Sequence, residues 1–358
     1  MPRLLFIVHG MGVHDTAWAD PTIAHLKKIP SDYGYEWFDA NGPLEDHVKC
    51  VPISYDKAFT ELLDQWAESA DELEQFASTE GVGIAKSLDF LQGASAAEQQ
   101  FFWTSVVDVL LYRLFPIVTA NVRDIVKKAI VERFTAETAA GSVVDVSIMA
   151  HSLGTSVTHD TLSIMATKPI QTPAGPNQSF MLGNFQFKRI FQVANVSRVL
   201  QTTPAVLSSP IHPFTVDPAT SYTRGFLNFK HRYDLFTMVR PFTAPAAWGG
   251  GFLEPAGINR ILGFNVHDLD LYLEDPRCHI PILRQLIDPA VVTPDEEADA
   301  LDAYDARPEP DCLQQLDDFK DRIDDLIAQA STSLDLQDLF IALTKAMTAA
   351  RDAKNACV

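Results

Sequence analysis

The sequence predicts an α/β protein, because short apolar segments that fit buried strands are followed by segments that fit helices. One such strand covers residues 4–8, and another covers 48–55. The clearest strand covers 143–149, between Gly141 and Gly154, and a helix-compatible stretch follows it. At 358 residues, the chain has room for one large α/β domain with insertions, or for two domains.

The first predicted strand leads directly into a glycine-rich loop, His9-Gly10-Met11-Gly12. Glycine lets a backbone approach another group closely, so the N–H groups of such a loop can reach a bound ligand. An ordinary glycine turn after a strand is the alternative interpretation. The choice between them depends on whether the chain also carries a nucleophile that the loop could serve.

Such a nucleophile is predicted where the 143–149 strand ends. Ser152 is flanked, two positions away on either side, by the small residues Ala150 and Gly154 at a strand-to-helix junction. This is the nucleophile-elbow pattern, with alanine in place of the commoner glycine, and its tight turn lifts the hydroxyl clear of the sheet. The N–H of Leu153 then lies at a helix N-terminus, where it can stabilise an oxyanion.

The two segments together resemble the α/β-hydrolase superfamily, in its lipase and esterase branch, over about 1–57 and 142–290. The resemblance implies a mostly parallel sheet of eight strands or slightly fewer, with helices on both faces. It implies that the loop after the first strand supplies a second oxyanion donor, from Met11 or Gly12. It also implies a serine nucleophile followed along the chain by an aspartate or glutamate and then by a histidine.

Candidates for the acid and the base follow two later predicted strands. The strand at 223–229 leads to Asp234, and the strand at 260–266 ends at His267, so both residues fit the implied order. A serine hydroxyl is a poor nucleophile until a base takes its proton, and a carboxylate orients that base and stabilises its charged form. We therefore predict Asp234 as the acid and His267 as the base, with Asp217 as the reserve acid.

Two other histidines lie near the predicted nucleophile in the sequence. His151 is inside the elbow, and we expect its side chain to point away from the chemistry of its neighbour. His159 lies on the following helix, where a packing or surface role is expected. A further strand, predicted at 185–193, comes between the elbow and the acid.

The charge of the chain bears on its partners. Lysine and arginine number 28 against 47 aspartates and glutamates, for a net charge of −19, and no run of basic residues is present. Nucleic-acid binding requires clustered basic residues, so the composition argues against it. The same charge disfavours stable docking on anionic lipid surfaces.

Cysteine usage predicts neither a metal site nor a disulfide framework. Cys50, Cys278, Cys312 and Cys357 are widely scattered and form no CxxC pair. No cofactor or metal is expected. The apolar segment near the N-terminus is too short for a secretory signal, so the expected location is cytoplasmic.

The predicted hydrolase core is interrupted and extended by helical segments. Residues 58–141 are expected to hold one core helix and a cap or lid; within them, 101–115 is strongly apolar but too short and too charged to span a membrane. That stretch could be buried in the core, or could roof a pocket for an acyl group. Residues 291–358 are expected to form an acidic linker followed by two amphipathic helices, at 312–329 and 334–350. These helices could pack on the core, form a hairpin or build a homodimer. Other helices are expected at 116–134, 269–273, 281–286 and 296–304.

These observations predict a serine hydrolase that cleaves carboxylic esters, similar to esterases and lipases, through Ser152, His267 and Asp234. An acyl-enzyme intermediate is expected, with a small-molecule or lipid-like ester as the substrate. A thioesterase, amidase, phospholipase or acyltransferase would use the same three residues and stays an alternative. A non-catalytic interaction protein that keeps the fold is a further alternative.

Overall fold

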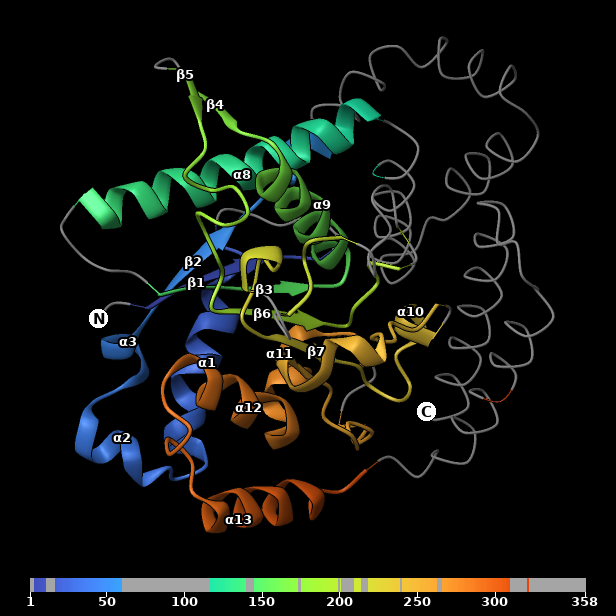
Figure 1. The fold of residues 1–358 in the computed structure, drawn as a ribbon. Helices are drawn as coiled ribbons and strands as arrows, with labels where there is room; N and C mark the ends of the chain where they lie inside the picture. The colour runs from blue at the N-terminus through green and yellow to red at the C-terminus, as the bar shows by residue number, and fades with distance from the viewer. Residues whose placement is uncertain are drawn as a thin grey trace.

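The computed structural model describes residues 3–10, 17–59, 112, 116–139, 145–172, 175–198, 200, 209–213, 218–238, 240–262, 266–309 and 321. These residues form a central sheet of six strands in which every neighbouring pair is parallel (Figure 1). In sheet order the strands are β2 (Val48–Ile53), β1 (Arg3–Val8), β3 (Asp145–His151), β6 (Arg189–Val193), β7 (Phe226–Phe229) and β8 (Phe252–Leu253). The predicted α/β class with a central parallel sheet is therefore confirmed.

The order of the strands changes direction at β1, because β2 lies on one side of it and β3 on the other. Val8 and Ala150 are register partners near the carboxyl ends of β1 and β3. In open parallel sheets, ligands bind outside the carboxyl ends of the strands at such a switch point. The loop after β1 and the turn after β3 therefore start at the edge where a site is expected.

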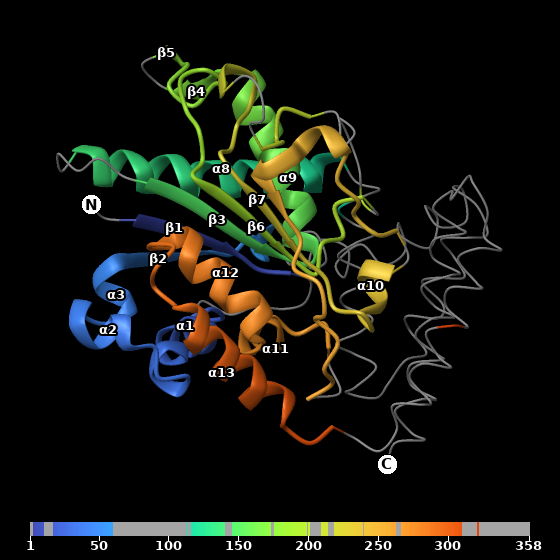
Figure 2. The ribbon, with the colours of Figure 1, turned by 60° about the horizontal axis from the view of Figure 1, so that its bottom comes forward.

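Helices cover both faces of the sheet (Figures 1 and 2). One face packs against α8 (Pro116–Ala139) and α9 (Leu153–Thr167), and the other against α1 (Asp20–Asp32), α11 (Leu269–Glu274) and α12 (Pro276–Leu286). Because both faces are buried, β1 is apolar at every position from Leu4 to Val8, with alternate side chains in the two cores. The remaining elements are α2 (Glu36–Asn41), α3 (Leu44–His47), β4 (Ile170–Thr172), β5 (Gly175–Asn177), η2 (Pro218–Thr220), α10 (Leu235–Met238), η3 (Ala246–Gly251) and α13 (Pro294–Asp305).

Local signals in the sequence explain where several helices begin. The side chain of Asp268 accepts a hydrogen bond from the N–H of Asp270 at the start of α11. At the start of α13, Thr293 and Glu296 form a reciprocal capping box. The helices expected at 116–134, 269–273, 281–286 and 296–304 are all present, with somewhat wider bounds.

The strand predicted immediately before His267 is wrong over its described residues. Residues 260–262 are neither strand nor helix, and the last strand of the sheet is instead β8. The apolar residue Ile261 is buried in a loop that is not part of the sheet. Its N–H donates a hydrogen bond to Oε1 of Glu309 at 2.9 Å. The buried apolar residue Ile261, which contributed to the predicted strand, thus lies in a loop.

Several predicted segments fall outside the described residues. Within the predicted insertion at 58–141, the structure describes residues 58 and 59, Tyr112 and α8, and α8 packs on the sheet as a core helix. The stretch 101–111 and most of the two predicted C-terminal helices, at 312–329 and 334–350, lie outside the described part.

Candidate active site

The backbone at Ser152 is strained. The residue lies between the end of β3 and the start of α9 with φ 53° and ψ −125°, a region that residues other than glycine rarely adopt. The N–H of Ser152 donates to the carbonyl of Val193 at 3.0 Å, which ties the turn to the end of β6. The side chain is therefore held at the carboxyl edge of the sheet by a sharp strand-to-helix turn.

Two glycines let this turn pack directly against the loop after β1. A Cβ on Gly154 would lie 2.3 Å from the carbonyl oxygen of His9, and a Cβ on Gly10 would lie 2.8 Å from Cβ of Ser152. Neither approach leaves room for a side chain. The first residues of the glycine-rich loop therefore lie against the candidate nucleophile.

His267 joins Ser152 to Asp234. Its Nε2 lies 2.7 Å from Oγ of Ser152, and its Nδ1 lies 2.9 Å from both carboxylate oxygens of Asp234. A carboxylate only accepts, so Nδ1 carries a proton and Nε2 of the neutral ring can accept the serine proton. The structure thus brings together the three residues that the sequence singled out.

Asp234 is completely buried, and its carboxylate oxygens accept several hydrogen bonds. Besides His267, the phenol of Tyr272 donates to its Oδ2 at 2.8 Å, and the N–H of Phe236 donates to its Oδ1 at 3.1 Å. Burial alone would raise the pKa of this carboxyl, but the electrostatic attraction of the His267 ring and the hydrogen bonds from His267 and Tyr272 outweigh it, so the pKa is lowered. The carboxylate is therefore ionised at neutral pH.

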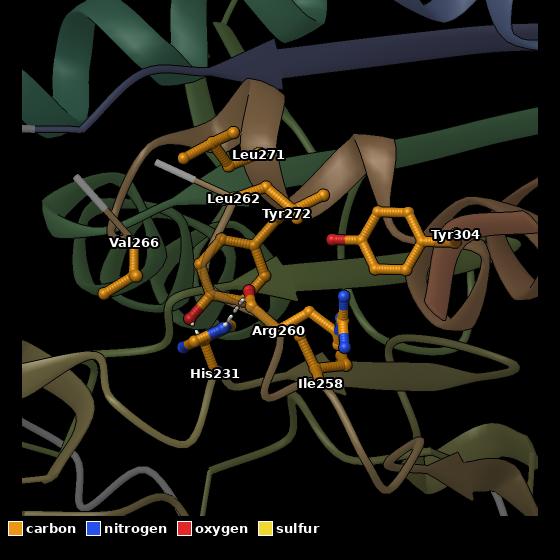
Figure 3. A pocket seen from close by; sticks show the side chains of 8 residues that line it. All are labelled: His231, Ile258, Arg260, Leu262, Val266, Leu271, Tyr272 and Tyr304. Atoms are coloured by element: carbon orange, nitrogen blue, oxygen red, sulfur yellow. Dashed lines mark hydrogen bonds between the residues drawn. The ribbon is translucent and has the colours of Figure 1, made fainter. Parts of the chain in front are cut away.

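Tyr272, on α11, connects Asp234 to the surrounding structure. Its hydroxyl accepts a hydrogen bond from the N–H of His231 at 2.7 Å while it donates to Asp234. Burial raises the pKa of Tyr272 far above its usual value, so it stays a neutral donor. Figure 3 shows Tyr272 and His231 at the wall of a cavity of about 10 Å³, a volume near the lower limit for one water molecule.

Sequence reasoning did not identify Tyr272 as a neighbour of Asp234. It lies in the apolar stripe of a helix, where a core aromatic residue looks the same. Its distance of five positions from His267 is the one feature that could have drawn attention to it. Its contact with the acid follows from how α11 packs on the sheet, which a single sequence does not reveal.

His151 contradicts the expectation that it points away from the chemistry of its neighbour. Its Nε2 donates to the backbone carbonyl of His267 at 2.6 Å, and the two rings lie 5.0 Å apart. Alternation along β3 explains the direction, because His151 shares a face with Met149, which packs in the core that includes α11. His151 therefore connects the turn at Ser152 to the loop that carries His267.

The candidate oxyanion donors are only partly within the described residues. Leu153 is the first residue of α9, so its N–H has no acceptor inside the helix. Met11 and Gly12 lie outside the described part of the chain, as does the reserve acid Asp217. The start of the loop is fixed by Tyr55, whose hydroxyl lies 2.8 Å from the carbonyl oxygen of His9 and 2.9 Å from that of Gly10.

His159 has a packing role, which was one of its two expected roles. It is buried, and its Nε2 lies 2.9 Å from Oγ of Ser209. Its Nδ1 lies 3.1 Å from Oδ1 of Asp160, whose Oδ2 accepts a hydrogen bond from the hydroxyl of Tyr112 at 2.9 Å. This second hydrogen-bonded set links α9 to residue 112 and to the 209–213 segment.

Fold and site together define an α/β protein with a parallel sheet and a hydrogen-bonded serine, histidine and aspartate at the carboxyl edge of that sheet. Comparisons with protein-family models, with curated proteins and with solved structures gave no match. The described residues contain no cluster of three or more side chains suited to holding a metal ion. None of the helices among them is both long enough and apolar enough to cross a membrane.

Proposed function

We propose that this protein is a serine hydrolase of the α/β-hydrolase type that cleaves carboxylic esters. The observation that carries the proposal is the continuous hydrogen-bonded path from Ser152 through His267 to Asp234, which begins at a serine with a strained backbone. A nucleophile, a base and an orienting acid in this arrangement are what acyl transfer through a serine requires.

The positions of the three residues in the fold support the superfamily resemblance. The serine follows β3, the acid follows β7, and the base follows β8, the last strand of the sheet. Their chain order is Ser152, Asp234 and His267, the order of α/β-hydrolases rather than that of the chymotrypsin or subtilisin folds.

In the proposed mechanism, Oγ of Ser152 attacks the ester carbonyl while Nε2 of His267 takes the hydroxyl proton. The N–H of Leu153 and a donor from Met11 or Gly12 stabilise the negative oxygen of the tetrahedral intermediate. His267 then gives its proton to the leaving alcohol, and an acyl-enzyme remains. A water molecule activated by His267 releases the acid, while Asp234 stabilises the imidazolium at both stages.

Tyr272 and His151 act as positioning residues in this mechanism. Tyr272 holds one oxygen of the acid, and His151 holds the backbone carbonyl of the base. Both contacts restrict how His267 can rotate between Ser152 and Asp234. A base fixed in this way needs no reorganisation when the serine attacks.

Labelling with a fluorophosphonate probe, followed by intact mass and peptide mapping, tests the proposal directly. We expect one adduct, on Ser152, and none in Ser152→Ala. Ser209→Ala is the matched control, because Ser209 also lies within hydrogen-bond distance of a histidine nitrogen, and this variant should still be labelled. With p-nitrophenyl esters, Ser152→Ala should lose at least about 10⁴-fold in kcat.

Two results speak against the proposal. A folded wild-type protein that takes no adduct and hydrolyses no ester would agree with a non-catalytic protein that keeps the fold. An adduct on Ser209 that persists in Ser152→Ala would place the reactive serine elsewhere. Circular dichroism of each variant verifies that it is folded before the labelling is interpreted.

A further inference from the structure

The segment 307–309, which follows α13, contacts the loop that leads to His267. Both carboxylate oxygens of Glu309 take part: Oε1 accepts a hydrogen bond from the N–H of Ile261 at 2.9 Å, and Oε2 lies 2.7 Å from Nη1 of Arg260. The guanidinium of Arg260 also donates to a backbone carbonyl of this segment, at residue 307. Three contacts therefore join the loop to a part of the chain that follows it by 48 residues.

The loop depends on these contacts because it has no strand or helix to hold it at this point. Residues 260–262 are neither, and Ile261 is only 3% exposed. A buried backbone N–H without an acceptor costs free energy comparable to a lost hydrogen bond. Glu309 supplies this acceptor and thereby stabilises one conformation of the loop.

The conformation of this loop bears on the position of His267. Leu262 and Val266, the residue immediately before the histidine, line the same cavity of about 10 Å³, together with Tyr272 (Figure 3). Tyr272 in turn donates to Oδ2 of Asp234 at 2.8 Å. In a closely packed interior, a shift of Leu262 therefore displaces Val266 and the hydrogen-bonded residues beside it.

His231 holds the loop from the side of the acid. Its Nδ1 accepts a hydrogen bond from the N–H of Tyr233 at 3.2 Å, and burial lowers its pKa, so the ring is neutral and Nε2 carries the proton. Nε2 donates to the carbonyl of Arg260 at 3.0 Å, while the backbone N–H of His231 donates to the hydroxyl of Tyr272 at 2.7 Å. Residues 260 and 261 are thus held between His231 and Glu309.

We propose that Glu309 is a positioning residue for the hydrolase reaction. It fixes the loop before His267 and so keeps Nε2 of the base within hydrogen-bond distance of Oγ of Ser152. A base that is already in place needs little reorganisation when the serine attacks. This role rests on the proposed function, and it makes the segment after α13 part of the support of the active site.

The rate of fluorophosphonate labelling at Ser152 tests this role, because the base activates the serine that the probe labels. Glu309→Ala removes both contacts and should be labelled to the same final extent as the wild type but about tenfold more slowly. Glu309→Gln keeps an acceptor for the N–H of Ile261 and should be labelled within about threefold of the wild-type rate. Glu309→Asp keeps the charge but is too short to make both contacts, and it replaces the alanine variant if that variant does not fold.

Glu297→Ala is the matched control. Glu297 lies on α13 and its Oε2 is 2.6 Å from Nη1 of Arg284, nearly the same contact as that between Glu309 and Arg260. Arg284 lies on α12 and not in the loop before His267. The control should be labelled within about twofold of the wild-type rate, since a partly exposed ion pair contributes little by itself.

Proton NMR provides a second readout that needs no reactive serine. The Nδ1–H of His267, which is hydrogen-bonded to Asp234, should give a downfield signal that is absent in His267→Ala. Exchange of this proton with water should be at least about tenfold faster in Glu309→Ala than in the wild type, and unchanged in Glu297→Ala.

Two kinds of result would overturn the proposal. Equal labelling rates in Glu309→Ala and Glu297→Ala, or a smaller labelled fraction at the wild-type rate, would mean that Glu309 does not position the base. Equal proton exchange in these two variants would mean that Glu309 does not hold the loop that carries His267. A wild-type protein that takes no probe would refute the hydrolase function separately, and the exchange measurement would still decide whether Glu309 holds the loop.

Discussion

Two sets of hydrogen-bonded residues in this protein contain the same four residue types in the same order. We call them the active-site chain and the α9 chain. The active-site chain consists of Ser152, His267, Asp234 and Tyr272, and the α9 chain consists of Ser209, His159, Asp160 and Tyr112.

The distances within the two chains are nearly the same. The serine oxygen lies 2.7 Å from histidine Nε2 in the active-site chain and 2.9 Å in the α9 chain. Histidine Nδ1 lies 2.9 Å from the carboxylate in the first and 3.1 Å in the second. Both serines are almost fully buried, at 0% and 1% exposure, so neither connectivity nor burial distinguishes the chains.

The backbone around each serine does distinguish them. Ser152 has a positive φ at the N-terminus of α9, and the backbone of Gly10 lies against its Cβ. Ser209 lies in a short irregular segment, and its Oγ accepts a hydrogen bond from the N–H of Ile211 at 3.2 Å. Backbone donors aimed at a developing oxyanion contribute much of the rate in acyl transfer. We therefore expect Ser152 to be reactive and Ser209 to be unreactive, because their backbones differ although their hydrogen-bond patterns agree.

The largest difference in kcat between the two chains is expected when their histidines are replaced. His267→Ala should lower kcat for a p-nitrophenyl ester by at least about 10⁴-fold, because the serine loses its base. His159→Ala should keep kcat within about threefold and cost about 1–3 kcal/mol in free energy of unfolding, because Asp160 and Ser209 each lose a buried partner. Steady-state kinetics and urea unfolding measure the two effects. A similar loss of kcat in both variants would remove the distinction between the chains.

A smaller effect is expected from the glycine behind the nucleophile. In Gly10→Ala the new methyl group would lie 2.8 Å from Cβ of Ser152 and 2.9 Å from Nδ1 of His151, so the loop or the turn must move. We expect kcat to fall by about 10²-fold, the usual cost of a misplaced oxyanion donor. Gly250→Ala is the matched control, since its methyl group meets no atom within 4 Å. Wild-type kcat in Gly10→Ala would show that the close approach does not set the rate.

The smallest effect is expected from the two tyrosines. Tyr272→Phe removes a donor to the ionised Asp234 and should lower kcat by about tenfold, the equivalent of one hydrogen bond to a charged group. Tyr112→Phe makes the same change in the α9 chain and should leave kcat within about twofold, because the described hydrogen-bond partners of Tyr112 are Asp160 and Thr119, which lie outside the active-site chain. Equal reductions in kcat would argue that both chains serve the reaction.

Acid unfolding provides a second measurement on the tyrosine variants. The pKa of Asp234 is lowered in the fold, so its ionisation stabilises the protein above the unfolded pKa of 3.8. That stability is lost as the pH falls through the lowered pKa. Without the hydroxyl of Tyr272 the pKa is lowered less, and the midpoint of acid unfolding should move to higher pH. Circular dichroism against pH detects the shift, and an unchanged midpoint would mean that Tyr272 does not stabilise the carboxylate.

The part of the site that depends on local sequence could be predicted. A tight strand-to-helix turn demands small neighbours, so the residues around Ser152 reveal both its backbone and its place at the sheet edge. Asp234 and His267 were predicted because each follows a stretch of apolar residues and both fit the order of residues that the superfamily resemblance implies. The helix after the base was also predictable, because α11 starts at a capping aspartate, Asp268.

The contacts that cross between elements could not be predicted. His151 reaches His267, and Tyr272 reaches Asp234, only because α11 packs on one particular face of the sheet. The last strand was also misplaced, because β8 has only two residues and gives no periodic pattern, whereas the apolar stretch around Ile261, a loop over its described residues, does. These contacts and the position of the last strand depend on how the elements pack together, which the residue types along the chain do not reveal.

The distance along the chain between serine and base has a consequence for biosynthesis. His267 is made 115 residues after Ser152, and at about 5–20 residues per second that interval lasts roughly 6 to 23 s. During this time the growing chain on the ribosome already contains Ser152, but not yet the histidine that forms a hydrogen bond with it. Any nascent chain that stops before residue 267 therefore lacks the hydrogen-bond partner of this hydroxyl, and the order of translation itself delays the assembly of the three residues.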